Sequence, residues 1–307
     1  MKENMYDIFK LLEERVLDAL DKTDLERIKY HLEKISTPTI TTGVGGSSIV
    51  STYVSKVLNT KNKIITTHQE PRDLIYNNLS GYKNIISCSY SGKNHGVKIA
   101  FNNDLNKYLL SNNEFTDKNI TNLTYQTTLP KEDSFISLGA TLIPMSIMLA
   151  YYNDNDISII KEILKTAQKY SIDYSKVYEI LSGYETKSAS TYLETTLTES
   201  GISIPIVHDK YAYCHGRNSL SYHNDHSLIY FNKYTELDKL LLRELPIYYK
   251  NIIQLDEKYK DQIIDDFYLT YQTMLLSKEI AKQQNSDLSR VDYPPVVKKL
   301  YYFKGEM

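Results

Sequence analysis

The sequence predicts an α/β protein built from two doubly wound parallel sheets of the flavodoxin or Rossmann type, with a helical arm at the N-terminus. Short β-branched segments alternate with amphipathic segments along most of the chain, which is typical of parallel sheets covered by helices. Two of the predicted strands run into turns rich in glycine and serine. We therefore expect an arm over residues 1–35, a first unit over 36–153, a second unit over 165–290 and a tail over 291–307.

The arm is predicted to contain two amphipathic helices, because apolar side chains recur in it at helical spacing. Thr23 or Asp24 is placed to cap the second of these helices. The periodic residues are Ile8, Leu11, Leu12, Val16, Leu20, Leu25, Ile28, Leu32 and Ile35.

The first unit is predicted to alternate strands with helices. Strands are expected at 38–43, 63–68 and 83–92, helices at 47–58, 71–79 and 96–110, and a further segment at 121–129 precedes a last helix. That last helix lies within 135–152, which has no charged residue but contains Gly139, Pro144 and several hydroxyl groups. A membrane span usually needs about 20 mainly apolar residues, so we expect a buried core helix.

The second unit repeats the alternation. Its expected elements are a strand that ends at Gly183, a helix at 186–201, a strand leading into a loop over 204–216, a strand at 226–232, a helix at 236–244, a strand at 252–256 and a helix at 260–283.

Composition excludes several classes of protein. The formal net charge of −2 provides no basic surface for a nucleic acid or an anionic membrane. The two cysteines, Cys88 and Cys214, are too few for a disulfide framework and fit a reducing compartment. The charged N-terminal stretch is unlike a signal peptide, so we expect a cytoplasmic protein.

The first glycine-rich turn has the composition of an anion site. Gly43, Gly45 and Gly46 allow a tight turn, and Ser47 and Ser48 follow at a helix start, where free N–H groups favour an anion. The third glycine of the dinucleotide fingerprint is missing, and no Gly-Lys-Ser/Thr follows. The turn therefore favours a simple phosphate over NAD or a nucleoside triphosphate.

A second turn, after the strand at 83–92, repeats this chemistry with Ser89, Ser91 and Asn94. Adjacent parallel strands bring their loops to one carboxyl edge of a sheet, so Ser47 is expected beside these three side chains. Either loop alone fits ordinary helix capping. The pair favours a phosphate, because uncharged N–H and O–H donors converge from two loops.

These turns resemble those of the sugar isomerase (SIS) domain family. Residues 89–94 resemble its Ser-X-Ser-Gly-X-Thr signature, with Asn94 in place of threonine, and residues 43–48 look like its first glycine–serine loop. Gly46 stands where many members have threonine. The resemblance implies two SIS units, no cofactor or metal, and a sugar phosphate held by Ser47, Ser89, Ser91 and Asn94.

Residues 191–218 are similar to the second SIS unit of the isomerase domain of glucosamine-6-phosphate synthase and of fructosamine deglycases. The resemblance places a proton-shuttling carboxylate at Glu199 and a ring-opening histidine at His215, which commonly comes from the neighbouring subunit. It puts Lys299 of the tail on an active-site lysine. Taken alone, Glu199 fits a solvated helix end and His215 an ordinary loop histidine; their sixteen-residue separation matches the family.

Some positions depart from the synthase. The proline after His-Gly is Arg217 here, which can add an anion contact or reshape the turn. A helix lysine becomes Thr196, a helix glutamate becomes Tyr192, and an arginine of the tail becomes Pro295. These departures put the synthase's own reaction in doubt.

Two other hypotheses, a metal site and a cysteine nucleophile, are less well supported by the sequence. His223 and His226 with Asp225 suggest a metal site, but no third ligand at helical spacing supports it. Cys214 adjoins His215, yet neighbouring residues of an extended segment point apart.

The sequence thus predicts a homodimeric enzyme with a shared active site that acts on a phosphorylated sugar or amino sugar. The reaction is an aldose–ketose isomerisation or the release of an amine by a deaminase or deglycase. The alternative is a non-catalytic sensor that binds a sugar phosphate and regulates a partner.

Overall fold

The computed structural model describes residues 7–130, 132, 134–166, 168, 170, 172–290 and 295–296. The chain divides into two compact units, residues 7–162 and 163–290, and the division falls within the helix α7, Ser158–Leu164. The predicted tail and its Lys299 lie outside the described residues, apart from Pro295 and Val296. No helix among the described residues is both long and apolar enough to cross a membrane.

The first unit contains a five-stranded parallel sheet in the order β2-β1-β3-β4-β5. Its strands are β1 Thr39–Thr42, β2 Thr66–His68, β3 Asn84–Cys88, β4 Asn106–Ser111 and β5 Ile120–Thr124. All residues of β1 and β3 are buried, as expected for parallel strands covered on both faces.

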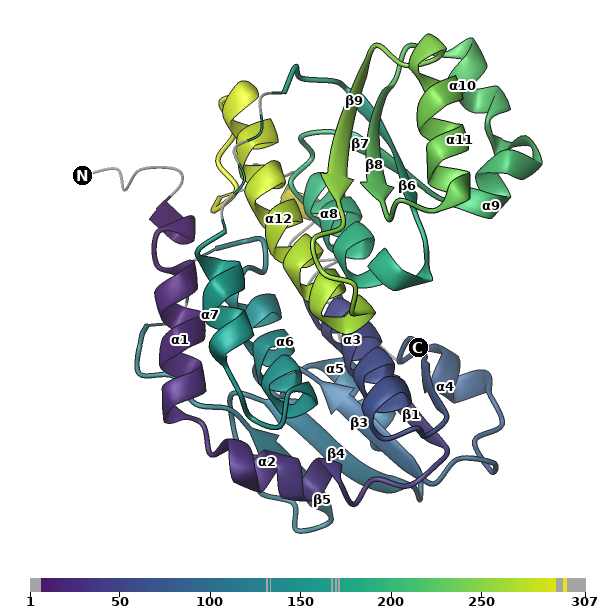
Figure 1. The fold of residues 1–307 in the computed structure, drawn as a ribbon. Helices are drawn as coiled ribbons and strands as arrows, with labels where there is room; N and C mark the ends of the chain where they lie inside the picture. Colours follow the sequence, from purple (N-terminus) through teal and green to yellow (C-terminus); the bar gives the residue numbers. More distant parts are fainter. Residues whose placement is uncertain are drawn as a thin grey trace. The chain divides into compact units, whose positions relative to one another are not determined.

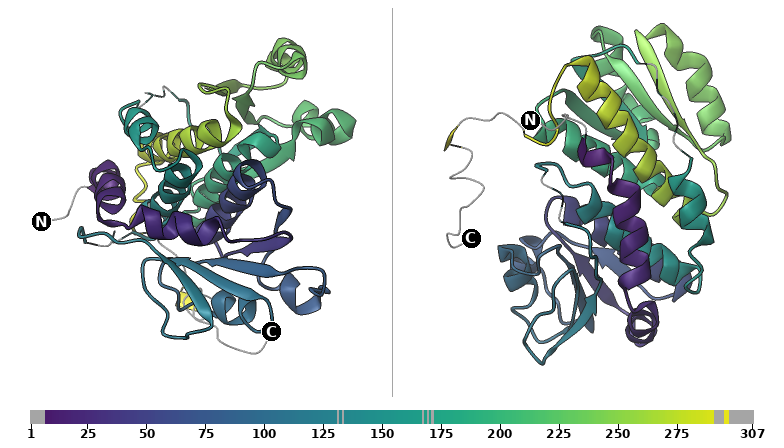
Figure 2. Two further views of the ribbon diagram at one scale, coloured as in Figure 1. Left: turned by 60° about the horizontal axis from the view of Figure 1, so that its bottom comes forward. Right: turned by 90° about the vertical axis from the view of Figure 1, so that its left-hand side faces the viewer.

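Helices cover both faces of this sheet (Figures 1 and 2). On one face α3, Gly46–Lys61, packs against α6, Gly139–Tyr152, and α6 also contacts α1, Leu12–Lys22, and α2, Leu25–Leu32. On the other face α4, Asp73–Tyr76, and α5, His95–Ala100, contribute Leu74 and Ala100 to a cluster with Ile40 and Ile85.

The helix α6 explains the uncharged stretch of the sequence. Its side chains are buried almost all round, including Leu142, Pro144 and Met145, so it is the core helix that the sequence predicts. Each fully buried aliphatic side chain contributes about 1.5–3 kcal/mol. The arm helices also form as predicted, and Asp24 caps the second by accepting a hydrogen bond from the Arg27 amide.

One predicted helix is wrong. Residues 96–110 form the short helix α5 and then the strand β4, rather than a single helix. Asn103 makes the turn between them, because its side chain donates to the Ala100 carbonyl and accepts from the Leu105 amide. The Asn-Asn-Asp cluster at 102–104 was the available signal for this turn.

The second unit contains a four-stranded parallel sheet in the order β7-β6-β8-β9. Its strands are β6 Val177–Ser182, β7 Ile204–Asp209, β8 Ser227–Asn232 and β9 Asn251–Asp256. Its helices are α8 Lys187–Glu199, α9 Lys210–Ala212, α10 Ser219–His223, α11 Glu236–Glu244 and α12 Gln262–Gln283. Short helical turns lie at Asp7–Phe9, Tyr184–Thr186, Tyr213–Arg217 and Leu245–Ile247.

The helices α8 and α12 pack against each other beside this second sheet (Figure 1). A separate apolar cluster joins Leu181 and Leu228 of the strands to Leu241 of α11. The sheet is therefore covered on both faces, and its carboxyl edge is built from the loops that follow β6, β7, β8 and β9.

Candidate functional site

The two serine loops of the first unit leave the same edge of the first sheet. The strands β1 and β3 are hydrogen-bonded neighbours in parallel register, with Thr42 opposite Ser87. The start of α5, directly after the second loop, also packs against the first loop. A Cβ added to Gly96, at the start of α5, would lie 2.6 Å from Cγ2 of Val44 in the first loop. The structure therefore places the predicted phosphate loops side by side.

The second loop is closed by its own side chains. The buried Ser89 accepts hydrogen bonds through Oγ from the Gly92 amide and from Nδ2 of Asn94, both at 3.1 Å. Asn94 in turn caps α5, because its Oδ1 accepts from the Val97 amide at 2.9 Å. Gly92 has a positive φ of 68°, which favours glycine. Asn94 thus caps the helix that follows the loop.

The hydroxyl groups of these loops retain donor capacity. Ser91 accepts through Oγ from the Lys93 amide at 3.3 Å, and Ser89 acts as an acceptor in both of its bonds. Ser47 lies in the first turn of α3, and its hydroxyl has no hydrogen-bond partner among the described residues. Hydroxyl protons that no protein acceptor uses are suited to an oxyanion.

The first loop leaves no room for a side chain at Gly46. A Cβ there would lie 2.8 Å from Oγ of Ser137 and 2.9 Å from Oγ1 of Thr141. Oγ of Ser137, just before α6, and Oγ1 of Thr141, in the first turn of α6, lie 2.9 Å apart. The first loop is therefore packed closely against the start of α6 at Gly46.

A third polar cluster at this edge escaped the sequence analysis. Ser48 donates to Glu70 at 2.7 Å, and its Oγ lies 3.2 Å from Nε2 of His68. Nδ1 of His68 lies 2.8 Å from Oγ of Ser51. The hydrogen bond from His68 lowers the pKa of Glu70, and the Ser48 bond acts in the same sense. The Ser48 hydroxyl is thus engaged by Glu70, unlike the hydroxyl of Ser47.

A groove of 750 Å³ borders the second loop on the side of α5. Gly92, Lys93, His95 and Phe101 contribute to its lining. The predicted phosphate donors do not line it. The groove therefore borders the second loop without including the predicted phosphate donors.

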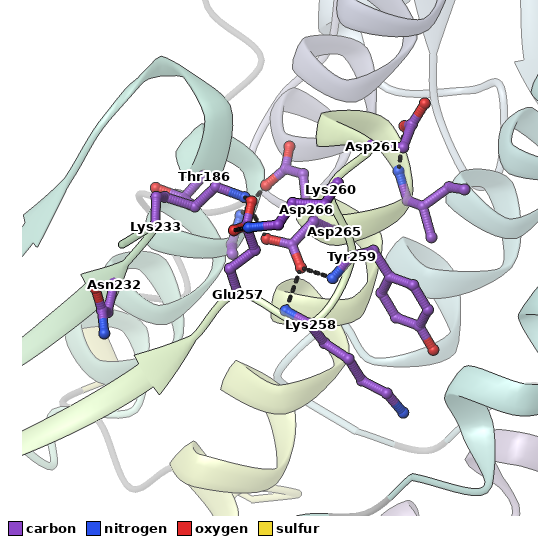
Figure 3. Close-up of polar contacts among 12 residues, drawn as sticks. Thr186, Asn232, Lys233, Glu257, Lys258, Tyr259, Lys260, Asp261, Asp265 and Asp266 are labelled. Carbon is purple, nitrogen blue, oxygen red and sulfur yellow. Dashed lines mark hydrogen bonds and ion pairs between the residues drawn. The ribbon is translucent and has the colours of Figure 1, made fainter. Parts of the chain in front are cut away.

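The second unit has a charged carboxyl edge. Nζ of Lys233, which follows β8, lies 2.7 Å from both Glu257 and Asp265, and all three side chains are buried (Figure 3). Lys210, which follows β7, pairs with the buried Asp238 at 2.6 Å. Both lysines at this edge are therefore already engaged by buried or nearly buried carboxylates.

Glu199 is the last residue of α8 and is exposed. No hydrogen bond or ion pair among the described residues holds its carboxylate. Partial loss of water raises its pKa, and the charge of Glu194 on the same helix adds to this effect. A carboxylate with a raised pKa is a better proton acceptor, as a general base requires.

His215 and Arg217 lie on an exposed segment that follows β7. Nδ1 of His215 lies 2.7 Å from the Tyr211 carbonyl, which leaves Nε2 directed away from the backbone. Gly216 has a φ of 105°, a left-handed conformation that favours glycine. Arg217 is exposed and has no ion-pair partner among the described residues.

Within the second unit, the structure does not bring Glu199 and His215 together. Glu199 precedes β7 and His215 follows it, so the two residues lie at opposite ends of this six-residue strand. A strand of that length spans about 20 Å. The order of the elements therefore separates the two residues within one copy of this unit.

The histidines of the 223–226 segment face different surroundings. His223 is exposed, whereas His226 is buried, with Nδ1 2.6 Å from Oε1 of Glu179. No group of three or more metal-ligating side chains gathers among the described residues. His226 therefore belongs to a buried network around Glu179, a residue that the sequence analysis did not single out.

No protein-family model matches the sequence, and no curated protein does. Solved structures match the fold over nearly the whole chain. The C-terminal domain of glucosamine-fructose-6-phosphate aminotransferase from Francisella tularensis shows 14% identity and a TM-score of 0.67, covering 96% of this chain and 99% of that one.

Two further solved structures, both of enzymes named for sugar phosphates, match the fold to a similar extent. Glucosamine-6-phosphate deaminase from Thermotoga maritima shows 15% identity and a TM-score of 0.72, covering 94% of this chain and 97% of that one. Tagatose-6-phosphate ketose/aldose isomerase from Escherichia coli shows 14% identity and a TM-score of 0.72, covering 94% of this chain and 96% of that one. At this identity the likeness concerns the fold, and the chain has the double α/β fold of the sugar isomerase proteins that its motifs resemble.

Proposed function

We propose that this protein binds a phosphorylated sugar or amino sugar at the carboxyl edge of its first sheet. The observation that carries this proposal is the contact between two glycine–serine loops whose donors are uncharged. The fold supports it, because the matching enzymes are named for sugar 6-phosphates.

In this proposal the phosphate accepts hydrogen bonds from Ser47, Ser89 and Ser91 and from loop amides. Asn94 keeps the second loop closed around it. The start of the 16-residue helix α3 adds the positive end of the helix dipole, although the Ser47 and Ser48 amides there already donate to the carbonyls of Val44 and Gly45. Neutral donors of this kind bind a dianion without burying a counter-charge, which allows product to leave.

The proposed reaction moves a proton between adjacent sugar carbons. His215 transfers the ring proton that opens the sugar, and Glu199 removes the proton from one carbon and returns it to the next. This interconverts an aldose and a ketose; with an amine on the sugar, the same proton transfer gives an imine, and water then hydrolyses its C=N bond to a carbonyl and the free amine, as in a deaminase or deglycase. Such acid–base assistance is worth about 10²–10⁴-fold in rate. Lys299 and Arg217 complete the proposal as contacts to the substrate.

We infer that the active site is shared between two copies in a homodimer. Glu199 and His215 lie at opposite ends of β7 within one unit, so a site that uses both needs His215 from a second chain. The exposure of the segment that carries His215 agrees with this arrangement.

A regulatory sugar-phosphate sensor is the second candidate. Tyr192 and Thr196 replace two polar residues of the synthase's catalytic helix, and both are buried in α8. They cannot assist chemistry from there. A protein that kept the phosphate loops but lost this assistance would bind a sugar phosphate without turning it over.

A ligand panel separates these possibilities. Thermal unfolding is measured with hexose, pentose and heptose phosphates and their amino derivatives, with free phosphate as control. A ligand at 100 times its Kd adds about 2.7 kcal/mol to the free energy of unfolding. A selective shift followed by turnover supports the enzyme, and a selective shift without turnover supports the sensor. No shift beyond that of free phosphate contradicts the proposed function.

A further inference from the structure

We propose that Glu179 is a positioning residue, which holds the exposed segment 214–220 in place from inside the second unit. The consequence for catalysis rests on the proposed role of His215 in this segment. The positioning itself does not, and it can be measured without a substrate.

Glu179 is a fully buried carboxylate in the middle of β6. Its Oε2 accepts hydrogen bonds from Ser221 at 2.8 Å and from Tyr249 at 3.1 Å. Its Oε1 lies 2.6 Å from Nδ1 of His226. Nε2 of His208 on β7 lies 3.4 Å from Oε2, and the three shorter contacts are the hydrogen bonds of the network.

The network reaches the segment from both ends. Tyr213, which precedes it, is buried, and its hydroxyl lies 2.9 Å from Oγ of Ser221 and 3.0 Å from the Tyr249 hydroxyl. Ser221, which follows it, bonds directly to Glu179. The seven residues between these two anchors are all exposed. Glu179 therefore ties both ends of a solvent-exposed segment to the centre of the sheet.

The segment has little else to hold it. Its other hydrogen bonds are local: His215 to Tyr211, the Asn218 amide to the Tyr213 carbonyl, and Asn224 to the Leu220 carbonyl. Local bonds of this kind can move with the segment. Among the described residues, the contacts of Tyr213 and Ser221 are the hydrogen bonds that connect it to distant parts of the unit.

A buried charged group by itself contributes little to the free energy of folding. Replacing such a group with packed apolar side chains is often neutral or stabilising, because the cost of removing a charge from water is large. Its hydrogen bonds are directional, however, and those to a charged group are stronger than neutral ones. Burial opposes the ionisation of Glu179, but the surrounding histidines and hydroxyls leave its pKa lowered. The carboxylate is thus an acceptor with fixed geometry.

The test compares hydrogen exchange of backbone amides in the full chain. Tyr249→Phe removes one hydroxyl from the network and keeps the ring. The matched control is Tyr268→Phe, because Tyr268 on α12 is also buried and its hydroxyl accepts a hydrogen bond from Gln168, outside the network. We expect exchange at Asn218 and Tyr222 to rise about five- to tenfold in Tyr249→Phe, the effect of one hydrogen bond. In Tyr268→Phe, exchange at these two amides should stay as in the wild type, when the two variants have the same free energy of unfolding.

Glu179→Gln provides the second variant. An amide has two N–H donors facing groups that already donate, so exchange of the segment should rise at least as much as in Tyr249→Phe. If a substrate is found, Tyr249→Phe should lower kcat while the Kd for the sugar phosphate stays within twofold. Equal exchange in Tyr249→Phe and Tyr268→Phe would overturn the positioning role. A wild type without turnover would instead contradict the proposed reaction. The positioning role of Glu179 would then still be tested by hydrogen exchange alone.

Discussion

Nδ2 of Asn94 donates a hydrogen bond to Oγ of Ser89 at 3.1 Å, so the last residue of the signature loop fixes its first serine. The same asparagine caps α5 through Oδ1. One side chain therefore sets both the shape of the loop and the start of the helix.

Ser89→Ala should weaken binding of the sugar phosphate by tenfold or more, measured by calorimetry. The change removes a predicted phosphate donor and the acceptor of two loop hydrogen bonds, each worth about 0.5–1.5 kcal/mol. Ser55→Ala is the control, because Ser55 is a buried serine of α3 that bonds to Thr66. Equal affinities of these two variants would remove Ser89 from the site.

Asn94→Thr should retain the loop, whereas Asn94→Ala should loosen it. Threonine is an effective helix cap, and loss of a cap costs about 0.5–2 kcal/mol. Chemical denaturation measures the stability of the two variants. An alanine variant as stable as the threonine variant would show that the cap contributes nothing.

Gly46→Ala should destabilise the protein by about 1–3 kcal/mol, because the added Cβ would lie 2.8 Å from Ser137. A second change, Ser137→Gly, opens that space and should recover part of the loss. A double-mutant cycle on the free energy of unfolding detects this coupling. Simple additivity of the two changes would contradict the predicted collision.

Glu194→Gln should lower the pKa of Glu199, because it removes the neighbouring negative charge. If deprotonated Glu199 is the active form, turnover falls as pH falls through its pKa, and the variant moves this acidic limb to lower pH. A pH–rate profile measures the shift, with the exposed Glu236→Gln as control. An unchanged limb in Glu194→Gln would separate Glu199 from the rate-determining proton transfer.

Mixing Glu199→Gln with His215→Ala, each inactive alone, should restore activity if the site is shared between two chains. Random exchange of subunits makes half of the dimers mixed, and each mixed dimer has one intact site, so roughly a quarter of the wild-type activity is expected. Turnover after subunit exchange measures this. Persistent inactivity of the mixture, with exchange demonstrated, would place both residues of a site on one chain.

Acid should weaken the second unit through Asp238. Hydrogen bonds from Lys210, Tyr230 and Thr235 outweigh burial and lower its pKa to about 2. Because the folded pKa lies below the usual value, the stabilisation of about 2 kcal/mol is present above pH 4 and is lost as pH falls towards 2. Denaturation curves for the wild type and Asp238→Asn over this range test it; parallel pH dependences would contradict it.

Most elements of the fold could be predicted because their signals are local. The helix at 236–244 has the predicted bounds, and the strands β1 and β8 lie within the predicted segments. The strand β4 was missed because Tyr108, Leu109 and Leu110 continue the apolar run of α5, and the turn at Asn103 separates them. A periodic pattern does not show where one element ends when the next is equally apolar.

The sequence by itself determined the two glycine–serine turns, their place after strands and their chemistry, since a turn and the helix that follows it are set by neighbouring residues. Only the tertiary structure decided that Ser48 is bound by Glu70, that Glu179 holds the segment around His215, and that Glu199 lies across a strand from His215. Strand order and burial bring together residues that are distant in sequence, and the pattern of side chains along the chain does not contain that order.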